Sequence, residues 1–100
     1  MVSKPTLIWD KSAYDALLVA YNYIKEDSIS NAIHVLDEIL KITRSLPDHP
    51  QKYPADKFKS NNSGNYRSFE KNSYRVTYKI TKTEIIILRI RHVKQEPKEF

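Results

Sequence analysis

The sequence predicts an α+β domain in which a helical hairpin packs on one face of an antiparallel sheet, with the element order β-α-α-β-β-β. Two stretches of apolar residues recur at helical spacing in the first half of the chain. Three β-prone segments follow in the second half, after a loop rich in proline and asparagine. At 100 residues the chain is of a size to bury one core, so we expect a single domain spanning residues 1–100.

The first strand leads directly into the first helix. Residues 6–9, "TLIW", form a short apolar and β-prone run. Either Asp10 or Ser12 is placed to cap the following helix, and Ser12 with Asp15 has the spacing of a capping box. Apolar residues then recur at steps of three and four between positions 13 and 24, which predicts an amphipathic helix that ends in the polar residues 25–27.

A second helix follows after a short turn. Ser28 lies in that turn and is the residue type that favours a helix N-cap. Pro47 ends the helix, because proline lacks an amide donor and disfavours helical backbone in the residue before it. Since the link between the helices is short, they form an antiparallel hairpin. The apolar face of the second helix consists of Ala32, Ile33, Leu36, Ile39, Leu40 and Thr43.

The second half of the chain begins with a loop and ends in three strands. Residues 47–64 hold three prolines, two asparagines and the only glycine, and such a long loop in a compact domain is either functional or mobile. The predicted strands are residues 65–70, 74–80 and 85–92, joined by hairpin turns at 71–73 and 81–84.

Side chains alternate across a strand, which assigns residues to the two faces of the predicted sheet. The residues expected to face the helices are Tyr74, Val76, Tyr78, Ile80, Ile86, Leu88 and Ile90. The residues expected on the opposite, open face are Arg67, Arg75, Lys79, Arg89 and Arg91. Like charges on one face repel one another, so this pattern favours a binding role for the open face over an ordinary solvated surface.

The charge of the chain is unevenly distributed. The formal net charge is +5, but residues 1–51 hold five Lys and Arg against seven Asp and Glu, whereas residues 52–100 hold twelve against five. The first half therefore carries a net charge of −2 and the second half a net charge of +7. A basic half of this kind favours a polyanion or an acidic protein as partner.

Several classes of function are excluded by composition. Gly64 is the only glycine, so no glycine-rich phosphate loop is possible, and the lack of cysteine removes thiolate metal sites and a cysteine nucleophile. The histidines lack ligand spacing, so we expect neither a metal nor a cofactor. The longest apolar run is residues 85–88, and the N-terminus carries no apolar signal core. We therefore expect a cytoplasmic protein without membrane contact.

Three segments carry a recognisable combination of features: "IWDKSAYDALLVAYNYIKEDS", "YRSFEKNSYRVTYKI" and "IIILRIRHVKQEP". A tryptophan precedes the first helix, a Tyr-x-Tyr-Ile run closes it, one strand reads Tyr-Arg-Val-x-Tyr, and the last strand ends in Arg-x-x-His. In this order and spacing the chain resembles the RelE/ParE superfamily of type II toxin–antitoxin toxins over nearly its whole length. The resemblance implies the β-α-α-β-β-β fold predicted above and a small basic toxin, of the ParE-like, plasmid-stabilising kind.

The superfamily includes two modes of action, and the residues bear on both. RelE-like members cut mRNA in the ribosome with basic residues on the second to fourth strands and a tyrosine near the C-terminus. Arg75 matches the arginine of the third strand, and Arg67 lies near the first basic position. Phe69 stands where a second lysine is expected, and Phe100 stands roughly where the tyrosine is expected. The RelE-like set is therefore incomplete.

The basic residue of the fourth strand is not fixed by the resemblance, and Arg91, His92 and Lys94 are the alternatives. His92 is the best candidate for proton transfer, because histidine is the side chain that ordinarily titrates near neutral pH. Its alternation with Ile86 and Ile90 places it instead on the core side at a strand end, where packing is the ordinary role. A RelE-like nuclease would use Arg75 and His92 as catalytic residues.

ParE-like members bind DNA gyrase and need no acid–base pair, so we favour this reading of the chain. It assigns target binding to a basic surface formed by Arg67, Arg75, Lys79, Arg89, Arg91 and Lys94. Three alternatives stay open: a RelE-like ribosome-dependent mRNA endonuclease, a superfamily member that has lost toxicity, and a nucleic-acid-binding module of another kind. Superfamily membership also implies a cognate antitoxin with an acidic, amphipathic C-terminal segment that folds along this domain.

Overall fold

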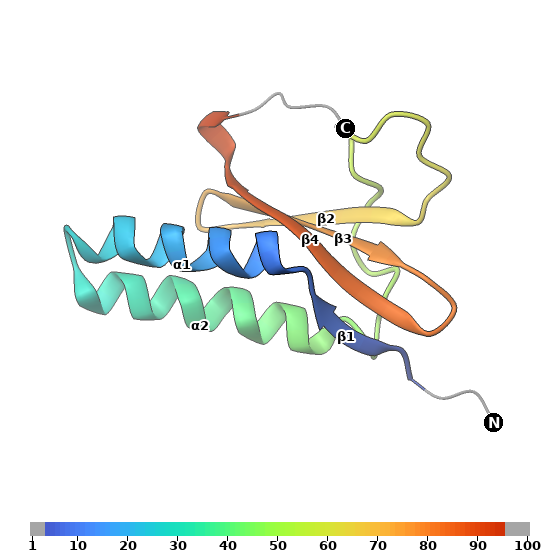
Figure 1. Ribbon diagram of the computed structural model, residues 1–100, viewed down its shortest axis with the longest axis horizontal. Coiled ribbons are helices and arrows are strands. Elements are labelled where there is room, and N and C mark those ends of the chain that lie inside the picture. The colour runs from blue at the N-terminus through green and yellow to red at the C-terminus, as the bar shows by residue number, and fades with distance from the viewer. Residues whose placement is uncertain (1–3, 96–100) are drawn as a thin grey trace.

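The computed structural model describes residues 4–95. It contains two helices and one sheet in the predicted order, which confirms the α+β fold class (Figure 1). Every predicted strand and helix is present, with ends that differ from the predicted ones by at most two residues. The elements are β1 (Thr6–Trp9), α1 (Lys11–Lys25), α2 (Ile29–Ser45), β2 (Tyr66–Lys71), β3 (Tyr74–Ile80), β4 (Glu84–His92) and a final 3-10 turn (Val93–Gln95).

The sheet has the strand order β1-β4-β3-β2. β2, β3 and β4 form the antiparallel meander that the sequence predicts. β1 pairs in parallel with β4, with Thr6 opposite Glu84 and Trp9 opposite Ile87, so the complete sheet is mixed. The parallel pairing places the N-terminal strand at one edge of the sheet, beside the last strand of the chain.

The two helices lie side by side along one side of the sheet (Figure 1). Their buried residues, such as Leu17 and Ile39, pack with Val76, Tyr78 and Ile87 of the sheet in one apolar core. Because α1 and α2 each bury a single stripe, neither helix is stable without the sheet beneath it. Within the part of the chain that is described, neither helix is long and apolar enough to cross a membrane.

The helix boundaries follow local chemistry. The Ser28 side chain accepts a hydrogen bond from the Asn31 amide at 3.1 Å, which confirms the predicted cap of α2. The capping box predicted for α1 is wrong, because the helix begins at Lys11 and Ser12 lies inside its first turn. Asp15 instead forms an ion pair with Lys11 at 2.9 Å.

One extra residue in β4 changes the face assignment of its first half. Thr77 pairs with Arg89 but Tyr78 pairs with Ile87, so Leu88 forms a β-bulge. Ile85 and Ile87 are fully buried in the core, and the prediction that Ile86 and Leu88 face the helices is wrong. Beyond the bulge the predicted alternation holds, with Ile90 in the core.

Candidate functional site: a covered basic face and an apolar groove

The face of the sheet turned away from the helices carries the positive charges. Strand pairing brings three predicted cations side by side across β3 and β4, with Arg75 opposite Arg91 and Thr77 opposite Arg89. Lys79 lies further along β3, opposite Tyr66. We call this surface the basic face. Its residues are Tyr66, Ser68 and Glu70 of β2, Arg75, Thr77 and Lys79 of β3, and Ile86, Arg89 and Arg91 of β4.

Arg67 does not belong to the basic face, so its predicted placement is wrong. It pairs with Tyr78, which points into the core, and therefore projects from the helix side of the sheet. Its guanidinium donates to the carbonyls of Gly64 at 3.1 Å and Tyr53 at 2.8 Å. Arg67 thus holds the long loop before β2, and the strand register that fixes its side is not visible in the sequence.

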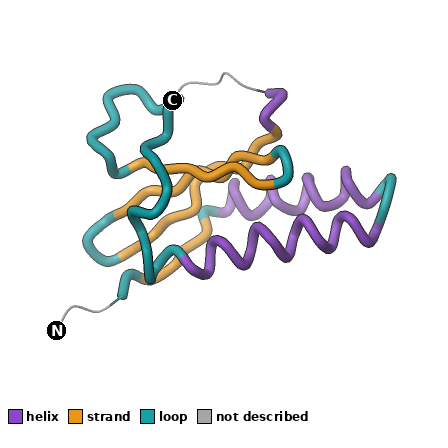
Figure 2. The backbone as a smooth tube through the Cα atoms, turned by 180° about the vertical axis from the view of Figure 1, so that it is seen from behind, coloured by secondary structure: helices purple, strands orange, loops and turns teal. Residues whose placement is uncertain are grey.

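The prediction that the basic face is open is wrong. Residues 46–65 form a loop, called the covering loop, and part of it packs on the basic face. The loop runs from the end of α2 past the strands before it enters β2 (Figure 2). Ala55 forms a bridge with Arg67, and the Asp56 amide donates to the Tyr66 carbonyl at 2.8 Å. These contacts pair the loop with the edge of β2 and turn the Asp56 side chain over the basic face.

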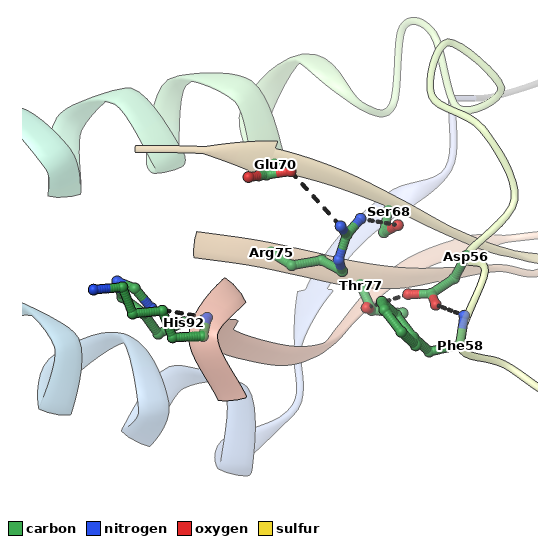
Figure 3. A network of polar contacts seen from close by, with 8 residues as sticks. Asp56, Phe58, Ser68, Glu70, Arg75, Thr77 and His92 are labelled. Atoms are coloured by element: carbon green, nitrogen blue, oxygen red, sulfur yellow. Dashed lines mark hydrogen bonds and ion pairs between the residues drawn. The ribbon is translucent and has the colours of Figure 1, made fainter. Parts of the chain in front are cut away.

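Asp56 is the buried carboxylate that fastens the covering loop. It is 2% exposed, and its two oxygens accept from the Thr77 hydroxyl at 2.6 Å and the Phe58 amide at 2.7 Å (Figure 3). A buried carboxylate needs such partners, because removing it from water without them is costly. Its negative charge also favours the charged form of Arg89.

The Phe58 ring lies between two arginines of neighbouring strands. The guanidinium carbon of Arg91 is 5.0 Å from the ring centroid and that of Arg75 is 5.4 Å. Arg91 is only 7% exposed, and Arg75 also contacts Ser68 at 3.4 Å and Glu70 at 3.7 Å (Figure 3). Burial, together with the neighbouring Arg91, lowers the pKa of Arg89 below its usual value. These three arginines are therefore largely covered rather than presented to solvent.

His92 lies on the other side of the sheet from Arg75. It pairs with Tyr74, its ring meets the Tyr74 ring edge-on at 5.1 Å, and its Nδ1 accepts from the Lys94 amide at 3.1 Å. Arg75 pairs with Arg91 on the basic face. The sheet thus separates the two predicted catalytic residues. Phe100 lies outside the described residues.

An apolar groove that the sequence reading missed lies beside His92, between α1 and the end of β4. It has a volume of about 600 Å³. Val19 and Tyr23 of α1 line it and are 68% and 66% exposed. Val19 and Tyr23 are four residues apart, so both lie on one helix face beside the core stripe. This apolar pair outside the core stripe was the signal in the sequence that could have predicted the groove. The remaining lining residues are Ala16, Ala20, Tyr74, Ile90, Arg91, His92 and Lys94.

Comparison with known proteins identifies the family. Residues 7–97 match the family model described as the ParE toxin of the type II toxin–antitoxin system parDE. The chain belongs to the ParE toxin family. No curated protein sequence matches this ParE-family chain.

Solved structures share the fold of this ParE-family chain. The chromosomal ParDE system from P. aeruginosa has a chain that aligns with a TM-score of 0.70 at 20% identity, covering 89% of this chain and 96% of that one. A chain of the toxin–antitoxin complex RelBE2 from Mycobacterium tuberculosis aligns with a TM-score of 0.61 at 18% identity, covering 90% of this chain and 99% of that one. The YoeB dimer from Staphylococcus aureus aligns with a TM-score of 0.58 at 14% identity, covering 90% of this chain and 98% of that one.

The basic face of this ParE-family protein is suited to electrostatic binding. The residues that define the basic face include no histidine, and the one acid buried against it, Asp56, is held by two donors. General acid–base catalysis requires a titratable group within hydrogen-bond reach of the reacting proton. The basic face offers guanidinium and ammonium groups, which neutralise negative charge.

Proposed function

We propose that this ParE-family protein is a growth-inhibiting toxin that binds DNA gyrase through its basic face. The observation that carries the proposal is the separation of His92 from Arg75 by the sheet. The predicted nuclease pair would have to act together, with His92 transferring the proton beside the arginine that neutralises the phosphate. A protein that acts by binding alone needs only the charges.

The covering loop restricts which charges meet a target. Arg91 is buried beneath Phe58, whereas Lys57 on the covering loop is exposed and Lys59 and Lys79 are half-buried. We therefore assign first contact with the target to these lysines. The covered arginines, Arg75, Arg89 and Arg91, supply the positive field beneath them. Such a field accelerates encounter with an anionic partner and weakens as salt rises.

The apolar groove is the surface we assign to the cognate antitoxin. An amphipathic helix that docks in a groove buries apolar residues at spacings of three and four, and Val19 and Tyr23 offer it an apolar wall. Lys94 is exposed at one end of the groove, so acidic residues beside the apolar stripe of the antitoxin would find a counter-charge. The basic character of the chain, +5 overall, favours an acidic segment in the same way.

The test is induction of the toxin without an antitoxin, with two readouts. A gyrase poison is expected to accumulate cleaved DNA and to trigger the DNA-damage response, while mRNA stays intact. Ribosome-dependent truncation of mRNA within minutes of induction, without DNA cleavage, would overturn the proposal. Normal growth with soluble, folded toxin would indicate a member that has lost toxicity.

Two variants sharpen this test. His92→Gln is expected to leave gyrase inhibition unchanged, because His92 lies on the helix side of the sheet. Lys79→Glu reverses a charge on the basic face and is expected to weaken inhibition at least tenfold. Lys41→Glu, at an exposed position of α2, makes the same charge change away from that face and is the matched control.

A further inference from the structure

One aromatic ring on the basic face has two lysines beside it. The Lys59 ammonium lies 4.9 Å from the centroid of the Tyr66 ring, and the Lys79 ammonium lies 5.4 Å from it. The two positive charges are therefore at most 10.3 Å apart, which is the sum of those distances. Lys79 comes from β3, directly opposite Tyr66, and Lys59 comes from the covering loop. We call these three residues the lysine clamp.

The lysine clamp is organised before any ligand arrives. Cation–π contact with the Tyr66 ring restrains both ammonium groups, and the Lys59 ammonium also donates to the Ser60 carbonyl at 2.9 Å. A lysine side chain has many rotamers, and its rotamer entropy is lost when a ligand immobilises it. Because part of that entropy is already lost in the fold, ligand binding costs less.

The surroundings of the lysine clamp add positive charge. Arg75, Arg89 and Arg91 lie on the same face, and two acids of that region, Asp56 and Glu70, already have partners. Asp56 accepts from Thr77 and the Phe58 amide, and Glu70 lies at the far end of β2 beside Arg75. A ligand that presents several negative charges in a row satisfies this surface better than one carboxylate does.

We propose that the lysine clamp binds the phosphate backbone of duplex DNA directly, in the absence of gyrase. The ring of Tyr66 is occupied by two ammonium groups, so it is not a platform on which an unpaired base stacks. Single-strand binding depends on such stacking, whereas duplex binding through phosphates needs only placed cations. The recognition is therefore independent of sequence and does not require strand opening.

A protein ligand fits this surface less well. Protein interfaces depend on aromatic or aliphatic residues that fill apolar pockets, and the apolar groove of this chain lies on the helix side, beside His92. On the basic face the rings of Phe58 and Tyr66 are both in contact with the chain's own cations. What this surface offers a partner is charge.

The inference is tested by fluorescence anisotropy with purified full-length toxin and a labelled 20-base-pair duplex, between 50 and 200 mM KCl. Two phosphates neutralised by the clamp give a slope of about −1.8 for log K against log[salt], or about a twelvefold loss of affinity over this range. Lys59→Gln and Lys79→Gln are each expected to reduce the slope by about 0.9, and the double variant removes both contributions.

The matched control is the double variant Lys25→Gln/Lys41→Gln, which removes the same charge from exposed positions on the helices. It is expected to keep the slope of the unmodified toxin. Three results would overturn the inference: no binding of duplex at 50 mM KCl, an equal loss of slope in the control, or tighter binding of the single strand than of the duplex. Gyrase is absent from this assay, so its outcome is separate from that of the DNA-cleavage test of the proposed function.

Discussion

The buried Asp56 carboxylate gives the sharpest test of how the basic face is built. Replacement by alanine removes the acceptor for the Thr77 hydroxyl at 2.6 Å and for the Phe58 amide at 2.7 Å. It also removes the negative charge that lies near Arg89. The covering loop would then be held on the sheet by backbone pairing beside β2, by the Arg67 side chain and by the Phe58 ring.

The expected loss of stability follows from these contacts. A hydrogen bond to a charged group contributes about 1.5–3 kcal/mol, and removing one partner from a set of buried charges costs about 3–5 kcal/mol. We expect Asp56→Ala to lower the free energy of unfolding by about 4 kcal/mol. That is a large part of the ~5–15 kcal/mol that holds a typical domain together. Asp56→Asn keeps the shape of the side chain and one acceptor oxygen, so we expect it to lower the free energy of unfolding by only about 2 kcal/mol.

Urea unfolding measures these changes. With an m value of about 2 kcal/mol per molar urea, Asp56→Asn is expected to shift the midpoint by about 1 M. A double-mutant cycle with Thr77→Val is expected to give a coupling energy of about 1–2 kcal/mol, because the two side chains share one buried hydrogen bond. Trypsin cleavage after Lys57 and Lys59 is expected to become faster in the variants. A loss below ~0.5 kcal/mol with no coupling would refute the idea that Asp56 fastens the loop.

Three further predictions concern other parts of the molecule. Ser73 has a φ of 70° in the β2–β3 turn, so Ser73→Gly is expected to stabilise the protein by about 1 kcal/mol in the same urea assay, with Ser63→Gly as control. Burial raises the pKa of Tyr78 to about 12, above its unfolded value near 10, so the stability from this group is complete below pH 10 and is lost between pH 10 and 12. Tyr78→Phe also loses the 2.8 Å hydrogen bond to the Pro50 carbonyl, so we expect it to lower the free energy of unfolding by about 1 kcal/mol at pH 8. Above pH 10 the urea midpoint of the variant is expected to fall less steeply than that of the unmodified protein. An equally steep fall would contradict the assignment. Val19→Glu in the apolar groove is expected to weaken antitoxin binding at least tenfold, measured by co-purification or titration, while toxicity persists. Ile29→Glu, at an exposed apolar position of α2, is the control. An equal loss of antitoxin binding in both variants would contradict the docking site.

The elements of the fold were predictable because their signals are local. The stripes of α1 and α2, the Ser28 cap and the Pro47 stop all lie within a few residues of what they determine. The predicted α2 stripe is wrong in one position, because Ile33 is 46% exposed and Val35 is buried. The parallel pairing of β1 with β4 was not predictable in the same way. It joins Thr6–Trp9 to residues more than seventy positions later, and no short-range pattern encodes that partner.

The covering loop shows where sequence reasoning stops. Composition identified residues 47–64 as a loop, but not that Asp56 would be buried or that Phe58 would lie between two arginines. The contacts of Asp56 with Thr77 and of Phe58 with Arg75 and Arg91 join residues 17 to 33 positions apart. The misplacement of Arg67 has a related cause, because a change of one residue in register moves a side chain to the other face.

The bulge at Leu88 determines which chemistry the basic face has. If β4 continued without it from the buried Ile85 and Ile87, strict alternation would turn Arg89 and Arg91 into the core and place His92 on the basic face. The histidine would then stand on the same side as Arg75. The extra residue restores the arginines to the basic face and carries His92 to the side of Tyr74 and the apolar groove. Because residues 85–88 are all apolar, no periodicity reveals the bulge, although it separates the predicted catalytic pair.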